Sequence, residues 1–270
     1  MGRWSERIDR IMRIRRLIRN WPTYIVRNRL GRAPLVTYEL RNGIRYAARR
    51  NSGDIASILD IWSKRIYSPA GFDIHVGDNV IDIGAHSGVF AIYAAEKAVR
   101  GTVYAFEPIQ DNYELMEKNI ALNNKGNVVP LRMAVAGSTG SQEIFLSSND
   151  LAHSLHETLL RESVVGSHKV ETISLEEVLQ RFCPNGVDML KMNCEGAEYE
   201  ILLNCPVELL RGIGRMAIQY HNIDDKLNVR VLKELLQSNG FSVEIRPPGE
   251  YSILYARMES RNPTTSNTFR

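Results

Sequence analysis

A cluster of polar side chains interrupts an apolar segment in the sequence DMLKMNCEGAEYEIL, residues 188–202. Lys191, Asn193, Glu195 and Glu198 stand within eight positions of one another. An unpaired buried carboxylate costs several kcal/mol or takes up a proton, so this cluster needs a cleft, a charged partner or a helix N-terminus. At the mouth of a cleft, such groups can move a proton and orient a bound hydroxyl. The segment therefore predicts a buried strand that ends at an active site.

A glycine turn with two carboxylates forms the second candidate site. In VIDIGAHSGVFAIYAA, Gly84 and Gly88 are four residues apart and Asp82 precedes them, while Glu107 ends the next apolar run, 23 residues beyond Gly84. Glycines let the backbone approach a ligand closely, and a carboxylate at the second strand tip can accept both hydroxyls of a ribose. Asp82 suits a cationic amine. This set matches an adenosine with an amino-acid tail better than a pyrophosphate, which favours few anions nearby.

Apolar strands alternate with helical segments from residue 79 onward, as an α/β sheet requires. The turn PPGE between the last two strands is too short for a parallel crossover, so these strands must pair antiparallel. Ligands of such sheets sit beyond the carboxyl ends of the strands, where both candidate sites fall. We expect strands at 79–84, 102–107, 128–135, 187–193, 215–221, 241–247 and 251–258, and helices at 88–98, 110–123, 174–181, 197–203 and 226–239.

The first 32 residues are strongly basic. They contain ten Arg and only two acidic residues, a balance of +8 that leaves −5 for the rest of a chain whose net charge is +3. Three alternatives stay open for this segment: a helix packed on the domain or on a second subunit, a helix on an anionic membrane surface, and a nucleic-acid arm. The mildly acidic remainder argues against an extended phosphate-binding face, so nucleic acid is disfavoured. Apolar residues at roughly helical spacing describe an amphipathic helix, namely Trp4, Ile8, Ile11, Leu17, Ile18 and Trp21.

Residues 35–70 are expected to form a lid on the catalytic domain. Asn42-Gly43 lies between two β-prone runs, which predicts a type I′ hairpin. Asp54 precedes a segment whose apolar residues fall on one helical face, and its side chain can cap the first turn. The predicted organisation is a basic helix at 1–34, the lid at 35–70, a catalytic domain at 71–258 and a flexible tail at 259–270.

Composition restricts the class of protein. A chain of 270 residues with 44% hydrophobic content can bury one sizeable core. Cys183, Cys194 and Cys205 form no CxxC pair, which favours a reducing compartment. No apolar run approaches the roughly 20 residues that a membrane-spanning helix needs, and the N-terminus lacks the apolar core of a signal peptide. We expect a cytoplasmic protein, with peripheral attachment to the inner membrane surface as an alternative.

Four segments resemble the FkbM-type S-adenosylmethionine-dependent methyltransferase family: VIDIGAHSGVFAIYAA, AFEP, ETISLEEVL and above all DMLKMNCEGAEYEIL. The similarity runs from about Leu35 to Arg257. It implies a Rossmann-like class I methyltransferase fold, with a seven-stranded, mostly parallel sheet and one antiparallel strand. It also implies S-adenosylmethionine as the methyl donor and O-methylation of a hydroxyl. Asn193 departs from the family pattern, where an aspartate is usual, and His86 is less common than an amide at its place in the loop.

The expected binding residues follow from these motifs. Methyl transfer is an in-line displacement, so the enzyme must hold an acceptor oxygen on the sulfur–carbon axis and supply a general base. His221, at the end of the fifth strand, is the first choice of base because its ordinary pKa lies near neutrality, and Glu195 is the second. The expected catalytic set is His221, Glu195, Asn193 and Lys191, and the expected cofactor-binding set is Asp82, Gly84, Ala85, His86, Ser87, Gly88, Glu107, Pro108, Met133 and Ala134.

A structural role for His221 and a divalent metal at the site are the alternatives. Glu195, Asn193 and His221 could face a metal together, but asparagine supplies only a neutral carbonyl and magnesium prefers charged oxygens, so we expect none. The segment HSLHE at 153–157 is not a zinc signature, and we expect it, with Ser154, in a loop that covers the active site.

The sequence therefore predicts an S-adenosylmethionine-dependent O-methyltransferase that acts on a hydroxyl of a small metabolite, sugar or glycolipid. The alternative is a catalytically altered S-adenosylmethionine-binding module, tethered to a membrane or partner by its basic helix. Asn193 is the residue that favours this alternative. RNA methylation is a third possibility, encouraged only by the Arg-rich end, and a homo-oligomer is compatible with the basic helix.

Overall fold

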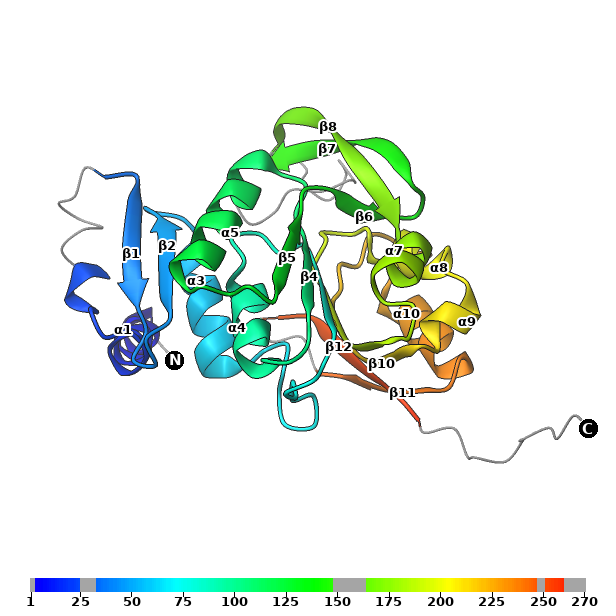
Figure 1. The fold of residues 1–270 in the computed structure, drawn as a ribbon, viewed down its shortest axis with the longest axis horizontal. Coiled ribbons are helices and arrows are strands. Elements are labelled where there is room, and N and C mark those ends of the chain that lie inside the picture. The colour runs from blue at the N-terminus through cyan, green and yellow to red at the C-terminus, as the bar shows by residue number, and fades with distance from the viewer. Residues whose placement is uncertain (1–2, 25–32, 148–163, 247–250, 260–270) are drawn as a thin grey trace, which may run out of the picture.

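A seven-stranded sheet forms the centre of the computed structural model, which describes residues 3–24, 33–147, 164–246 and 251–259 (Figure 1). Neighbouring strands pair in parallel except at β12, which runs antiparallel to both β10 and β11. The prediction of a mostly parallel sheet with one reversed strand is confirmed. In sheet order the strands are β11 (Phe241–Ile245), β12 (Ile253–Met258), β10 (Ile213–Gln219), β9 (Val187–Met192), β3 (Val80–Ile83), β4 (Val103–Phe106) and β5 (Val128–Leu131).

Helices cover both faces of this sheet. Val80 and Met189 belong to one apolar cluster and their chain neighbours Ile81 and Leu190 to the other, because successive strand residues point to opposite faces. Both faces are therefore buried, which explains why these strands are nearly continuous apolar runs. In Figure 1, α4 (Val89–Lys97) and α5 (Gln110–Leu122) lie on one side, and on the other lie α7 (Leu175–Phe182), α8 (Glu198–Leu203), α9 (Val207–Leu210) and α10 (Val229–Ser238).

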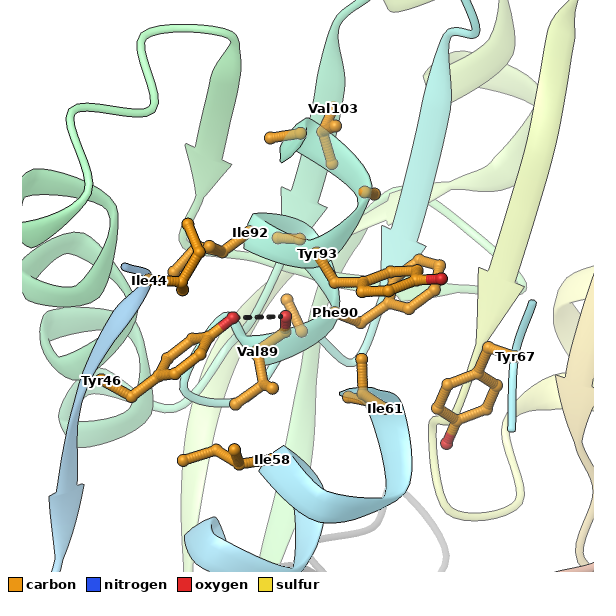
Figure 2. Packing of buried hydrophobic residues seen from close by; sticks show 14 of the residues in the cluster. Ile44, Tyr46, Ile58, Ile61, Tyr67, Val89, Phe90, Ile92, Tyr93 and Val103 are labelled. Carbon is orange, nitrogen blue, oxygen red and sulfur yellow. Dashed lines mark hydrogen bonds between the residues drawn. The ribbon is translucent and has the colours of Figure 1, made fainter. Parts of the chain in front are cut away.

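The N-terminal elements share the core that surrounds α4. Figure 2 shows Tyr46 and Ile58 packed around this helix. The Tyr46 hydroxyl donates to the Val89 carbonyl at 3.3 Å and accepts the Trp62 ring N–H at 2.9 Å. The segment predicted as a lid is thus fixed to the core around α4. Its elements are the antiparallel pair β1 (Leu35–Glu39) and β2 (Arg45–Arg49), α3 (Asp54–Leu59) and the π-helix η1 (Asp60–Lys64), and the basic segment before it forms α1 (Arg3–Leu17).

The hairpin at Asn42-Gly43 exists, but the predicted type I′ turn is wrong. A type I′ turn needs positive φ at both central residues, whereas Gly43 has a φ of 89° and Asn42 is not in the positive region. The Gly43 amide donates to the Leu40 carbonyl at 3.0 Å, and Leu40 and Ile44 flank a three-residue loop. This geometry is a type I turn followed by a left-handed glycine, the usual three-residue hairpin.

Asp54 does not cap its helix, which corrects the second lid prediction. The N-cap residue is Gly53, and no side chain caps the helix. Asp54 is 1% exposed, and its carboxylate accepts the Arg49 backbone amide at 2.7 Å and the Arg49 guanidinium at 3.0 Å. Burial raises the pKa of Asp54, but these hydrogen bonds outweigh it and lower that pKa. Asp54 therefore anchors the hairpin rather than the helix.

A second, three-stranded sheet was not expected from the sequence. The predicted strand at 128–135 breaks after β5, and β6 (Ala134–Ala136) joins a different sheet with β8 (Val164–Ser174) and β7 (Gly140–Ser147). Most residues of β8 before Thr172 are not buried, so this strand lacks the apolar alternation on which the prediction depended. The predictions at HSLHE, at PPGE and in the tail after residue 259 lie outside the described residues.

The basic segment packs through only part of the predicted apolar face. Ile18 is 0% exposed, and Leu17 and Trp21 pack against the core. Ile11, expected on the same face, is instead 44% exposed, and Ile14, which was not in the predicted set, is 1% exposed. Within the described ranges, no helix is both long and apolar enough to cross a membrane. The helix is therefore held to the domain by its C-terminal half.

The turn geometry predicts a stability difference between two glycine variants. Gly43→Ala should lower the free energy of unfolding by about 1 kcal/mol, because a Cβ is strained at positive φ even where it meets no atom within 4 Å. The matched control is Gly126→Ala, where a Cβ also meets no atom within 4 Å and φ is not left-handed. Urea denaturation measures both, and equal stability of the two variants would exclude the left-handed glycine.

Candidate functional site

A cavity of about 220 Å³ lies where the central strands end. Ile83, Phe106 and Gln219, at the ends of β3, β4 and β10, line it, as does Asn193 just after β9. The lid forms the opposite wall, with residues of α3, of η1 and of the segment after η1 that ends at Tyr67. Both sequence motifs therefore open into one cavity, as the placement at the strand ends predicted.

The glycine loop after β3 touches the segment after β9. Gly84 has a φ of 73°, and a Cβ on it would lie 1.9 Å from the carbonyl oxygen of Asn193. The backbone amide of Asn193 in turn donates to the Ile83 carbonyl at 3.0 Å. Gly84 is thus required by the close approach of two backbone segments, which brings the two motifs together.

Glu107 is held at the cavity wall by three donors. Its carboxylate accepts the backbone amides of His86 at 2.8 Å and Ile109 at 3.0 Å, and the Asn112 side-chain amide at 3.3 Å. Burial raises the pKa of Glu107, and these hydrogen bonds oppose the rise. Because a carboxylate offers about four lone-pair sites, one site is still free to accept a ligand hydroxyl.

Lys191, which lines the cavity, forms a buried ion pair with Asp82, which does not. The Lys191 ammonium lies 2.8 Å from the Asp82 carboxylate and donates to the carbonyls of Gly84 at 2.7 Å and Ile83 at 3.3 Å. An ammonium has three donors, so these partners use all of them. Burial raises the pKa of Asp82, and Lys191 opposes the rise. Asp82 does not line the cavity, and the donors of Lys191 are all used within the protein. The geometry therefore favours a structural role for both residues. The role of Asp82 toward a ligand amine and the catalytic role of Lys191 stay predictions.

Glu195 faces the cavity from a strained backbone position. Its φ is 51°, a conformation that non-glycine residues rarely adopt and that tends to occur at functional sites. Two residues earlier, the buried Asn193 Oδ1 has no hydrogen-bond partner in the described part of the chain, and the same holds for Ser87 Oγ. Both residues line the cavity, so a bound ligand can satisfy these atoms.

His221 lies between two carboxylates rather than on the cavity wall. Its Nδ1 is 2.7 Å from the fully buried Glu198, and its Nε2 is 3.3 Å from Glu195. Burial lowers the pKa of His221, but the hydrogen bond to Glu198 and both negative charges outweigh it and raise the pKa to about 8. Burial also raises the pKa of Glu195, and His221 opposes that rise. The order from cavity to interior is therefore Glu195, His221, Glu198.

The cavity includes most of the predicted residues and several that were missed. Gly88 and Met133 do not line it, whereas the remaining predicted residues of the glycine loop and of the next two strand ends do. No group of three or more His, Cys, Asp or Glu side chains that could hold a metal occurs among the residues with described positions. The sequence predicted a lid but none of the lid residues that line the cavity, which are Ala56, Ser57, Asp60, Ile61, Ile66 and Tyr67.

Comparisons with known proteins show which family this chain resembles. The model of the Methyltransferase FkbM domain matches residues 82–243. The methyltransferase sdnD of Sordaria araneosa is 25% identical over 232 residues, which cover 73% of this chain and 88% of that protein. The hexuronic acid methyltransferase AglP of Haloferax volcanii is 28% identical, over 58% of this chain and 62% of its own. The 31-O-demethyl-FK506 methyltransferase FkbM of Streptomyces tacrolimicus is 23% identical, over 77% of this chain and 89% of that protein.

The raised pKa of His221 predicts a pH dependence of stability. The folded pKa of about 8 exceeds the ordinary value of about 6.5, so protonated His221 stabilises the fold below pH 6.5 and this contribution is lost as pH rises through 8. Between pH 6 and pH 9 the unfolding free energy should fall by up to about 2 kcal/mol more in the wild type than in His221→Gln. Denaturation at several pH values measures this, with exposed His75→Gln as control. Parallel curves for wild type and His221→Gln would contradict the contact with Glu198.

Proposed function

The chain belongs to the FkbM methyltransferase family, since the family model matches more than half of it, and we propose that it is an S-adenosylmethionine-dependent O-methyltransferase. Its acceptor is a hydroxyl of a small metabolite, sugar or glycolipid. The class I methyltransferase fold expected from the sequence agrees with the seven-stranded sheet, in which β3 and β9 are central neighbours and β12 alone is reversed. The observation that carries the proposal is that Glu107 and Glu195, one acid from each motif, line one cavity.

The residues at the glycine loop fit the cofactor. Glu107 would accept a ribose hydroxyl, because its carboxylate is fixed by backbone amides at the cavity wall and one acceptor site is still free. Ser87 Oγ and Asn193 Oδ1 offer polar atoms that lack partners among the described residues. Pro108 and Ala134 add apolar surface on the same wall. When it is bound, S-adenosylmethionine supplies an electrophilic methyl group on a sulfonium.

Glu195 is the general base in this proposal, and His221 positions it. Glu195 lines the cavity and can accept the proton of an acceptor hydroxyl, which would make that oxygen a better nucleophile. Its raised pKa makes the carboxylate a stronger base than a solvated one. Both ring nitrogens of His221 already face carboxylates, which leaves no free ring nitrogen for the acceptor. The order of preference from the sequence, with His221 first, is therefore reversed in the proposal.

Asn193 is the observation that favours the alternative, a binding module without turnover. An amide cannot take up a proton at neutral pH, so Asn193 cannot replace an aspartate as a base. Its unpartnered Oδ1 can still accept a hydrogen bond from an acceptor hydroxyl. Because Glu195 supplies a carboxylate two residues away on the same wall, the amide at 193 does not remove the basic group from the cavity.

Replacement of Glu195 tests the base. Glu195→Gln should lower turnover by about 10²-fold or more, because the amide keeps the shape but cannot take the proton. The measurement is methyl transfer from labelled S-adenosylmethionine into an extract of the source organism, with exposed Glu208→Gln as the matched control. Full activity of Glu195→Gln would refute its role as base, and loss of cofactor binding would show a binding role instead.

Replacement of Glu107 tests the cofactor site separately. Glu107→Ala should weaken S-adenosylmethionine binding by about tenfold or more, since a hydrogen bond to a charged group contributes roughly 1.5–3 kcal/mol. The thermal shift that the cofactor induces reports this, and Asp111→Ala, at an exposed carboxylate nearby, should keep the wild-type shift. Stabilisation of the wild type by NAD alone would overturn the methyltransferase proposal.

A further inference from the structure

Helix α1 has two faces of different character. Ile14 and Ile18 pack into the domain, whereas Ile11 and Met12 are 44% and 41% exposed. Arg15 and Arg16 follow these residues by one helical turn and are also exposed, so the four side chains lie together on one outer face. We call Ile11, Met12, Arg15 and Arg16 the outer face of α1. Two large apolar side chains are thus partly exposed to water beside two cations.

The charges of the outer face are not neutralised within the described part of the chain. Of the acidic side chains whose positions are described, Asp9 pairs with Arg13 at 2.6 Å and Glu39 with Arg19 at 2.8 Å. No carboxylate of the described residues pairs with Arg15 or Arg16. The Arg41 guanidinium donates to the backbone carbonyl of Arg15 at 3.0 Å, which brings a further cation to the same end of the helix.

We propose that the outer face of α1 docks on an anionic membrane surface. A helix that lies in the interface inserts apolar side chains to the headgroup boundary while its Arg residues bind anionic lipid, which is the pairing found here. A nucleic acid would use the Arg residues but give no burial to Ile11 and Met12. The rest of the chain carries −5, so the attraction is confined to the N-terminal segment.

The docked helix lies next to the lid wall of the cavity. Helix α1 contacts α3 and η1, and both of these elements line the cavity, through Ser57 and Asp60 among others. Figure 1 shows α1 at the outer end of the molecule, beside the β1–β2 hairpin. Docking therefore brings this wall toward the bilayer. On the premise of the proposed function, the acceptor hydroxyl belongs to a membrane lipid, such as a glycolipid, rather than to a free metabolite.

Vesicle binding by the full chain tests the surface. The wild type should sediment with vesicles that mix phosphatidylglycerol and phosphatidylcholine, but not with phosphatidylcholine alone, and high salt should release it. Arg15→Glu/Arg16→Glu should bind more weakly by roughly thirtyfold or more, since the loss of each Arg near such a surface removes about 1 kcal/mol and each Glu adds repulsion. Ile11→Ser/Met12→Ser should also bind more weakly, although its charge is unchanged.

The matched control is Lys118→Glu/Arg230→Glu, which changes the net charge equally at exposed positions outside α1 and should bind as the wild type does. The cofactor-induced thermal shift shows whether each variant is folded. Unchanged binding by Arg15→Glu/Arg16→Glu, equal binding to neutral vesicles, or retention on RNA without vesicle binding would overturn the proposal. Methyl transfer to lipid and water-soluble extract fractions is scored separately. Vesicle binding without any transfer would refute the proposed function and leave the docking surface standing, whereas transfer to water-soluble material alone would refute the lipid acceptor.

Discussion

The geometry of the site depends on the buried ammonium of Lys191. This group lies on β9, 4% exposed, and its partners are the Asp82 carboxylate on β3 and the carbonyls at the end of β3. Removal of one member of a buried ion pair leaves an unpaired charge and typically costs about 3–5 kcal/mol, so neither residue can change alone. The pair fixes β3 against β9, and Gly84 then lets the two strand-end loops touch.

The two acids that face the cavity are positioned by separate networks. Glu107 is held by backbone amides of the glycine loop and of the start of α5, and the Arg49 side chain donates to Asn112 at 2.7 Å. Arg49 thereby links the N-terminal hairpin to the residue that we assign to the ribose. Glu195 is instead backed by His221 and, behind it, by Glu198. In the proposed function, cofactor binding and proton transfer thus depend on two separate sets of contacts at the same edge of the sheet.

The sequence predicted the central sheet well because its signals are local. Each strand is a short apolar run, and too few residues separate β11 from β12 for a parallel crossover, so β12 must be reversed. Two lid details failed because they depend on one residue of register or on a side-chain partner that periodicity does not show: Gly43 ends a three-residue loop, and Asp54 binds Arg49. The strands β7 and β8 were missed because β8 is largely exposed and so carries no apolar period.

The order of groups at the site could not be predicted from spacing. The sequence places Glu195 and His221 at neighbouring strand ends but does not show that Glu198, 23 residues before His221, binds its second nitrogen. Nor does apolar periodicity show that Ile11 is exposed on α1, because the spacing does not tell how much of the apolar face the domain covers.

A crystal structure of the chain with S-adenosylhomocysteine tests most directly that the two motifs serve one methyl-transfer site. We predict that the ribose hydroxyls contact the Glu107 carboxylate and that the sulfur lies on the side of the cavity lined by Asn193 and Glu195. A ribose bound away from Glu107, or a sulfur directed away from Glu195, would contradict the assignment of both acids.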